Sequence, residues 1–390
     1  MSAVETTFAP EVVVEFIMTA VTIVYAFADD IGDYKVMQDA HSSVKTDKSV
    51  IINVADGHGS QYGHFVAKAV VGVTGAEEKT PEEDIAIRQG FADKTLQAAV
   101  WNSDVSGLTG GATFTQVCVN TTTGDLSGYY VGDSPVVVFD FDTPSESVSI
   151  PDNVDGVELT TEVHNMTNYE EYLRLRKLGA RATYVHTRGA VEFDAKTREL
   201  INVPSIVDRR NVDLSYTNTK CCTVCCGCKV SDCEENCTHE KQCKLSVCEN
   251  GCNHKYVVGK IFPSDVRNSK DLGVAFPNGL SLNLSRALGD NAYKPYGVID
   301  TPSVFSLAAV SGKTRVIVVS SDGCGDMLHY YATPGVHEND MWKIIKENFG
   351  NPDATARALV AASKVATDKF FGASGQQDNI AVAVIYVTYP

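Results

Sequence analysis

Long runs of apolar residues along the chain predict buried strands. Residues 49–55 (Ser-Val-Ile-Ile-Asn-Val-Ala) and 315–320 are almost continuously apolar, and an aspartate follows closely after each run. Residues 380–387 alternate between apolar positions on two sides, which predicts a closing strand. Shorter segments with turn residues between them predict an antiparallel meander of three strands, at 113–119, 127–131 and 136–141.

Helical periodicity predicts five helices, over residues 62–71, 83–101, 168–178, 339–348 and 352–369. Asn339 is the expected N-cap of the fourth helix. In the second helix, the expected buried face carries Ile87, Phe91, Leu96 and Val100. An antiparallel meander combined with paired helices favours sheet layers flanked by helices over a doubly wound parallel sheet, so the predicted class is α+β.

The length of 390 residues exceeds the usual size of one domain, so we considered one enlarged domain or two domains. The apolar pattern runs from the first strands to the last one and is interrupted at 181–278, where the chain is polar and rich in cysteine. We therefore expect a single domain over residues 1–390, with an insertion at 181–278.

Charge and composition narrow the expected partners. With 33 Lys and Arg against 49 Asp and Glu, the net charge of −16 argues against nucleic acid and anionic membrane surfaces. The apolar stretch at 12–28 contains Glu15 and follows no basic residue, so it predicts neither a signal peptide nor a membrane span. We expect an intracellular protein, cytoplasmic or nuclear, with no membrane insertion.

Aspartates gather at the predicted strand ends and turns: Asp39, Asp56, Asp133, Asp322, Asp326 and Asp378. A single Asp-Gly pair is usually a turn. If several converge, two carboxylates 4 Å apart repel by about 4 kcal/mol at an effective dielectric constant of about 20, so the cluster requires cations. An all-oxygen ligand set suits Mg or Mn.

These aspartates belong to an ordered series of short motifs that resembles the type 2C protein phosphatases, from about residue 20 to residue 388. Seven motifs occur in order: Gln38-Asp39, Asp56-Gly57-His58-Gly59, Gly111-Ala112-Thr113, Gly132-Asp133-Ser134, Leu284 to Asp290 (Leu-Ser-Arg-Ala-Leu-Gly-Asp), Ser321-Asp322-Gly323 with Asp326, and Asp378-Asn379. The resemblance implies a two-layer antiparallel β-sandwich flanked by α-helices on both faces (α-β-β-α), with a metal site at one end.

The resemblance also implies roles for individual residues. Asp56, Asp322 and Asp378 are the expected core metal ligands, with Asp39 beside them and the backbone carbonyl of Gly57. Asp133 and Asp326 are expected to hold a further, weaker ion, so the cofactors are two or three Mg or Mn ions.

The implied reaction is hydrolysis of phosphoserine and phosphothreonine in a phosphorylated protein substrate by a metal-bound hydroxide, without a phosphoenzyme. His58 is the expected general acid for the leaving oxygen, against the alternative of a solvated turn histidine. A monomer is expected.

Two departures from the family pattern concern Gln38, where a glutamate is common, and Tyr34, where many members place a phosphate-binding arginine. Lys35 is the expected substitute, as a point charge without the bidentate fork of arginine. These changes motivate an alternative function, a catalytically weak or inactive pseudophosphatase that acts as a scaffold or adaptor. A third alternative is a metal-buffering or redox-sensing protein built around the cysteines.

Ten of the twelve cysteines lie in 221–252, inside the region where the family carries a flap beside the active site. Pairs at short spacing, with His239 and His254 nearby, favour structural zinc. Disulfides and free or redox-active thiols remain alternatives. The candidate zinc ligands are Cys222, Cys225, Cys228, Cys233, Cys237, Cys248 and Cys252. From its position, the segment is expected to select substrates or recruit a partner.

Overall fold

The computed structural model describes residues 16–17, 21–59, 62–73, 79–101, 104–142, 157–165, 168–178, 181–184, 192–193, 200–202, 272–275, 281–328, 341–371 and 377–389. The cysteines of 221–252 and the predicted N-cap Asn339 lie outside these residues. The two cysteines inside them, Cys118 and Cys324, are free thiols.

The first of two large sheets is antiparallel throughout, in the order β1-β2-β19-β18-β9-β10. Its strands are β1 (Phe16–Ile17), β2 (Thr22–Asp30), β9 (Val136–Asp142), β10 (Val157–Thr160), β18 (Lys313–Ser320) and β19 (Ile380–Thr388). Strand β19 pairs with β2 along its whole length, so the last strand of the domain joins one of the first.

The second large sheet is also antiparallel, in the order β17-β8-β7-β4-β3. Its strands are β3 (Ala40–Lys45), β4 (Ser49–Ala55), β7 (Phe114–Asn120), β8 (Leu126–Val131) and β17 (Ser303–Leu307). The predicted meander is therefore split between the sheets, because β9 crosses to the first one.

Three small sheets complete the strands. The first joins β5 (Gly57–His58), β6 (Gly111–Ala112) and β16 (Leu288–Gly289). The second joins β11 (Arg181–Tyr184), β14 (Leu272–Ala275) and β15 (Ser281–Leu282), and the third joins β12 (Glu192–Phe193) and β13 (Leu200–Asn202). The sheet of β5, β6 and β16 brings two motifs of the sequence beside His58.

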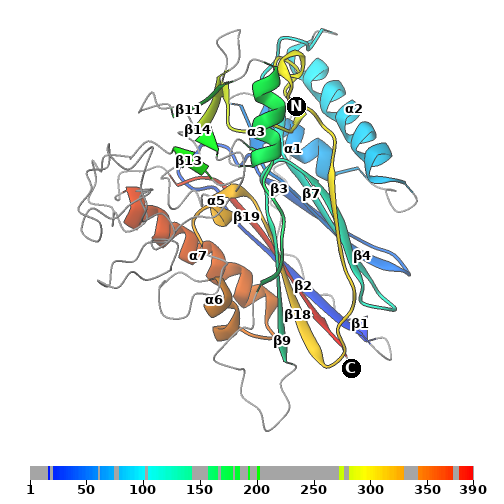
Figure 1. The fold of residues 1–390 in the computed structure, drawn as a ribbon. Helices are drawn as coiled ribbons and strands as arrows, with labels where there is room; N and C mark the ends of the chain where they lie inside the picture. Colours follow the sequence, from blue (N-terminus) through cyan, green and yellow to red (C-terminus); the bar gives the residue numbers. More distant parts are fainter. Residues whose placement is uncertain are drawn as a thin grey trace, which may run out of the picture.

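The helices are α1 (Gly63–Val71), α2 (Pro81–Val100), α3 (Tyr169–Lys177), α5 (Asp322–Gly325), α6 (Met341–Glu347) and α7 (Pro352–Phe371), with a 3₁₀ turn at Lys294–Tyr296. Figure 1 shows α1 and α2 on the side of β4 and β7, and α6 and α7 on the side of β18. Among the described residues, no helix combines the length and the apolarity that crossing a bilayer requires.

Strand β19 is buried on both faces and organises the core. The predicted alternation is confirmed: Ile380, Val382, Val384 and Tyr386 belong to a cluster with apolar residues of α6 and α7. The alternate residues of the strand, Ala381, Ala383, Ile385 and Val387, belong to a second cluster that includes β4 and β7 of the other sheet. A third cluster joins α1 and α2 to β7 and β8. The prediction of antiparallel sheets with flanking helices is therefore confirmed.

The predicted buried face of α2 is correct only in the second half of the helix, where Leu96 is buried and Val100 packs against the core. Phe91 is 44% exposed and Ile87 is half-buried, whereas Asp84 and Arg88 are buried. The reason is an ion pair between Asp84 and Arg88, one turn apart on the core side, which occupies positions that a simple apolar pattern assigns to solvent. The start of α2 follows sequence rules, because Thr80 and Glu83 form a capping box.

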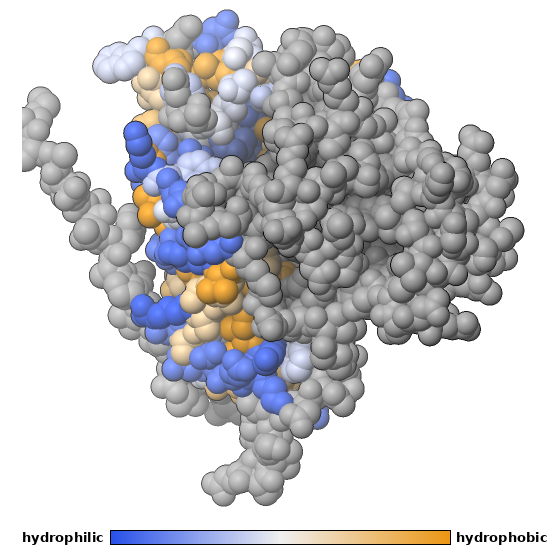
Figure 2. Space-filling view, turned by 90° about the vertical axis from the view of Figure 1, so that its left-hand side faces the viewer, coloured by the Kyte–Doolittle hydropathy of each residue, from blue (hydrophilic) through white to orange (hydrophobic). Residues whose placement is uncertain are grey.

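Large exposed apolar side chains are spread over several elements, and they include Trp101, Val304 and Val365. Figure 2 shows one face of the molecule, on which small hydrophobic groups are bordered by hydrophilic ones. Scattered apolar residues of this kind are normal on a protein surface.

Candidate active site

Topology brings the aspartates to one edge of the two sheets. Strand β18 ends at Ser320, which pairs with Val382 near the start of β19. Asp322, which follows β18, and Asp378, which precedes β19, therefore lie at the same edge of the first sheet. Asp56 follows β4 of the second sheet. Fully buried strands thus fix the backbone of these three residues.

The carboxyl groups lie close enough to change one another's pKa values. Burial raises the pKa of Asp39 well above its usual value, and the negative charges of Asp322 and Asp378 raise it further. Burial likewise raises the pKa of Asp56 well above its usual value, with added contributions from Asp39, Asp378 and Asp133. Five aspartates from distant parts of the chain therefore share one site.

The carboxylates contact one another. The side chain of Asp56 interacts with those of both Asp39 and Asp322. In this arrangement, no three acidic, His or Cys side chains of the described residues enclose a position for an ion. One oxygen of Asp39, Oδ2, is buried without a hydrogen-bond partner. A group of half-buried and buried acids with an unsatisfied buried oxygen fits the donor set of a hard divalent cation.

Thr113 links two of these aspartates. Its hydroxyl oxygen accepts from the backbone N–H of Asp56 at 2.9 Å and lies 2.6 Å from the hydroxyl of Ser134. Its own backbone N–H donates to the carbonyl of Asp56 at 2.8 Å. Asp133 precedes Ser134, so Thr113 fixes the spacing between the end of β4 and the turn that carries Asp133.

Asn379 holds the segment 31–39 against Asp378. Its Oδ1 accepts from the backbone N–H of Gln38 at 2.7 Å, and its Nδ2 donates to the carbonyl of Ile31 at 2.5 Å. Gln38 therefore contributes through its backbone to the position of Asp39. Lys35 and Tyr34 are exposed in the same segment.

His58 is paired with Asp290. Nε2 of His58 is hydrogen-bonded to Oδ2 of Asp290, whose side chain is fully buried. Burial lowers the pKa of His58, but the charge of Asp290 and this hydrogen bond outweigh that effect and raise it above its usual value. The arrangement favours the protonated form of His58.

The predicted site residues divide into three groups. Asp39, Asp56, Asp133, Asp322 and Asp378 are brought together. Asp326 lies one turn of α5 after Asp322, with its N–H 2.7 Å from the carbonyl of that residue. Lys35 is exposed, Gly57 is buried in β5, and the candidate zinc ligands lie outside the described residues.

Sequence reasoning assigned no role to Asp290, Ser321 or Asn379. Ser321 is hydrogen-bonded to Asp39 through its side chain. Their position in the sequence could have identified them, since all three stand inside or beside motifs already noted. Their partners lie far away in sequence, 232 residues in the case of His58 and Asp290.

The profile of the protein phosphatase 2C family matches residues 30–361. No curated protein matches the chain. A crystal structure of serine-threonine phosphatase 2C from Toxoplasma gondii is 13% identical, covers 97% of this chain and 100% of its own, and gives a TM-score of 0.52. At this identity, that likeness concerns the fold.

Two further structures are similar over 93% of this chain. The Mycobacterium tuberculosis serine/threonine phosphatase PstP/Ppp is 12% identical, with 97% of its own length covered and a TM-score of 0.40. A C. elegans sex determining protein is 14% identical, with 64% of its own length covered and a TM-score of 0.49.

Proposed function

The chain belongs to the protein phosphatase 2C family, and from this premise we propose that it hydrolyses phosphoserine and phosphothreonine in proteins with the help of divalent metal ions. Family membership supports metal-dependent phosphatase activity and phosphoprotein substrates. The observation that carries the proposal is the crowding of the acids, because Asp322 and Asp378 raise the pKa of Asp39, and Asp39 raises the pKa of Asp56. A cation at this edge of the sheets offsets their repulsion.

The proposed ligands of two Mg or Mn ions are Asp39, Asp56, Asp322 and Asp378, with the backbone carbonyl of Gly57. Asp133 and Asp326 are the proposed ligands of a further ion. When bound, such ions supply positive charge beside the phosphoryl oxygens and activate a water molecule. The backbone of Asp56 is fixed by Thr113, and that of Gln38 by Asn379, so the acids are held in place before substrate binds.

His58 is the proposed general acid. Its side chain is 22% exposed, so the imidazole is reachable from solvent while the side chain of Asp290 is fully buried. Asp290 orients the ring through Nε2, which leaves Nδ1 to donate a proton to the leaving serine or threonine oxygen. An alkoxide leaving group needs this proton, and general acids contribute about 10²- to 10⁴-fold to such rates.

We propose that the two large sheets and their outer helices form the four-layer α-β-β-α sandwich of a single domain. Residues 181–278 then form an enlarged flap, and its cysteines at 221–252 bind structural zinc. Zinc content and thiol titration of the protein would test the metal, with disulfides or free thiols as the alternatives.

A pseudophosphatase scaffold is the second candidate. Tyr34 stands where many family members carry a phosphate-binding arginine, and it is 45% exposed with Lys35 exposed beside it. A scaffold does not need a buried cluster of acids, however, and the cluster is costly to keep. For this reason catalysis is the function we propose.

The test is hydrolysis of a phosphothreonine peptide by the full chain, with and without millimolar Mn or Mg. Activity should require metal and vanish in Asp322→Ala. A matched control is Asp353→Ala, which removes an aspartate of an exposed ion pair on α7 and should keep full activity. Absence of turnover in a protein that binds Mn would favour the scaffold.

A further inference from the structure

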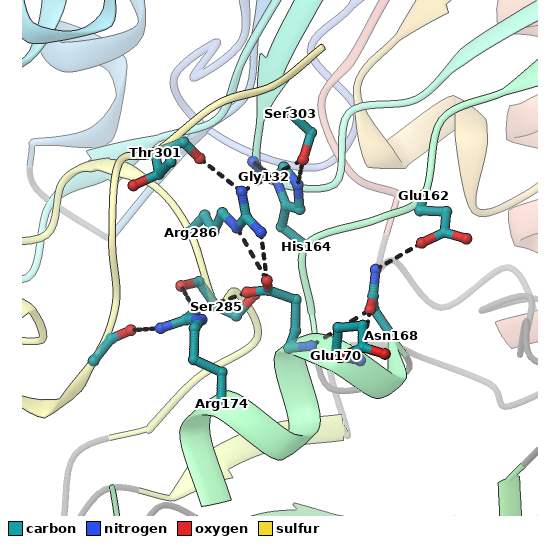
Figure 3. A network of polar contacts seen from close by, with 12 residues as sticks. Gly132, Glu162, His164, Asn168, Glu170, Arg174, Ser285, Arg286, Thr301 and Ser303 are labelled. Carbon is teal, nitrogen blue, oxygen red and sulfur yellow. Dashed lines mark hydrogen bonds and ion pairs between the residues drawn. The ribbon is translucent and has the colours of Figure 1, made fainter. Parts of the chain in front are cut away.

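The segment between β10 and α3 is tied to the turn that carries Asp133. The backbone N–H of His164 donates to the carbonyl of Gly132 at 3.0 Å, and the N–H of Gly132 donates to Nδ1 of His164 at 3.1 Å. Because Nδ1 accepts, the ring proton is on Nε2, which donates to the hydroxyl of Ser303 at 2.8 Å. Figure 3 shows this pairing between Gly132, His164 and Ser303.

The same segment is anchored to α3 through a buried carboxylate. Glu171 accepts from the hydroxyl of Ser285 at 2.5 Å, from Nη2 of Arg286 at 2.6 Å and from Nη2 of Arg174 at 2.7 Å. Although burial disfavours its charge, these hydrogen bonds lower the pKa of Glu171 to about 2. The side chains converge at the start of α3 (Figure 3).

Two backbone contacts connect Glu171 to the segment. The N–H of Ser285 donates to the carbonyl of His164 at 2.8 Å, and Asn165 forms a β-bridge with Leu284. We call His164, Asn165, Glu171, Ser285 and Arg286 the α3 clamp. In it, the backbone of Asn165 is joined to Leu284, and the preceding residue His164 is joined to Gly132.

The side chain of Asn165 reaches the candidate metal site. Asn165 is 5% exposed, and its side chain is hydrogen-bonded to the carboxylate of Asp133. An amide N–H donated to a carboxylate leaves the other lone pairs free for a cation and restricts the rotation of the carboxylate. Groups that orient a metal ligand in this way strongly affect metal affinity.

We propose that Asn165 is a positioning residue for Asp133, held by the α3 clamp so that the carboxylate faces the divalent ion proposed there. The inference rests on the proposed function, since it assigns Asp133 to a metal. It adds that the helix leading toward the flap and this metal ligand form one connected unit, because Glu171 and Asn165 belong to the same clamp.

The test measures Mn binding to the full chain by titration calorimetry, for the natural protein and for Asn165→Ala, Asn165→Leu and Asp133→Asn. Leu keeps about the volume of Asn without its hydrogen-bond donor, so Asn165→Leu replaces Asn165→Ala in the test if the alanine variant folds poorly. We expect the Mn affinity of the weakest-binding site to fall about 10- to 100-fold in both Asn165 variants. Asn165→Ala should add nothing in the Asp133→Asn background, since it acts through Asp133.

Asn351→Ala is the matched control. Asn351 lies before α7, outside the α3 clamp, and its side chain accepts from the N–H of Ala354. This variant should destabilise the start of α7 without changing Mn affinity. In activity assays, the Asn165 variants should need more Mn for half-maximal rate and regain kcat at saturating Mn, which a purely structural defect does not do.

The outcomes separate the two proposals. If Asp133→Asn weakens Mn binding and neither Asn165 variant does, the inference is wrong and the proposed function stands. Equal losses in Asn351→Ala and Asn165→Ala, or additive effects of Asn165→Ala and Asp133→Asn, also overturn the inference. If Asp133→Asn leaves Mn binding unchanged, the metal role of Asp133 in the proposed function fails.

Discussion

Asp290 is hydrogen-bonded to Nε2 of His58, and its side chain is fully buried whereas that of His58 is partly exposed. The two residues meet because Gly111 of β6 pairs with His58 of β5 on one side and with Gly289, the residue before Asp290, on the other. A Cβ on Gly111 would lie 2.5 Å from the carboxyl group of Asp290, so glycine is required there. This small sheet therefore assembles a histidine–carboxylate pair from three motifs.

Asp290→Asn should slow hydrolysis of a phosphothreonine peptide by on the order of 100-fold, because a neutral amide no longer supports the imidazolium. Hydrolysis of p-nitrophenyl phosphate should change little, since its leaving group needs no proton. Parallel kinetics on the two substrates check this prediction. An equal loss on both substrates would indicate a structural role for Asp290.

The same variant should change the pH profile. Asp290 raises the pKa of His58, so the protonated acid persists to higher pH and its contribution is lost as the pH rises through that pKa. Without Asp290 the pKa is lower, and the alkaline decline in kcat for the phosphopeptide should begin at lower pH. An unshifted decline would assign it to another group.

The stability of the metal-free protein should fall with rising pH. The raised pKa values of Asp39 and Asp56 mean that the folded state binds more protons than the unfolded chain, so its stability is lost as the pH rises through those values. In EDTA, we expect a lower Tm at about pH 7.5 than at about pH 5.5. Millimolar Mn should reduce the difference.

Asp39→Asn provides the control for this effect. Removing one buried charge should raise the Tm in EDTA at neutral pH and shrink the increase that Mn produces. A lower Tm of this variant in EDTA would show that Asp39 stabilises the metal-free fold, contrary to the expectation.

Gly132→Ala should destabilise the protein and reduce its activity. Gly132 has φ +107°, and a Cβ there would lie 2.6 Å from a methyl carbon of Thr113. We expect a loss of about 2–5 kcal/mol in the free energy of unfolding, from strain and overlap together. Gly350→Ala, at φ +81° in open space, should cost only about 1–2 kcal/mol and keep full activity.

Strand β4, most of β18, and the alternation of β19 were predictable because local sequence determines them. A continuous apolar run must be buried, and the aspartate that follows it must emerge at a sheet edge. Strand β2 was not predicted, although it overlaps the apolar stretch at 12–28. Its burial depends on pairing with β19, more than 340 residues later, and no local periodicity distinguishes it from another buried segment.

The polar partners of the site residues could not be predicted from the sequence either. Asp290 and Asn165 each acquire a role from a side chain contributed by another element, and the sequence spacing between such partners carries no information. The order of the motifs identified Asp290 as a motif residue, but it did not indicate the function of this side chain. For Asn165 there was no signal at all, since a lone Asn-x-Thr sequon next to a helix is ordinary.

The ion pair of α2 shows what such hidden partners contribute to stability. Arg88 is fully buried above the ring of Phe114, 4.1 Å from its centroid, and bonds to Asp84 and to the carbonyl of Val70. Asp84 also accepts from the hydroxyl of Tyr129 on β8. Loss of one partner leaves the other charge buried and unpaired.

Asp84→Ala should therefore lower the free energy of unfolding by about 3–5 kcal/mol, as measured in urea, whereas Asp84→Leu combined with Arg88→Met should cost much less. The control is Asp353→Ala, which breaks an i,i+4 pair with Arg357 of the same spacing on the exposed face of α7 and should cost about 0.3–0.5 kcal/mol. If Asp84→Ala and Asp353→Ala lower the free energy of unfolding equally, burial of the α2 pair does not increase the penalty for losing one partner. A double variant no better than Asp84→Ala would mean that the pair itself, and not the avoidance of an unpaired charge, stabilises the packing of α2 on the sheet.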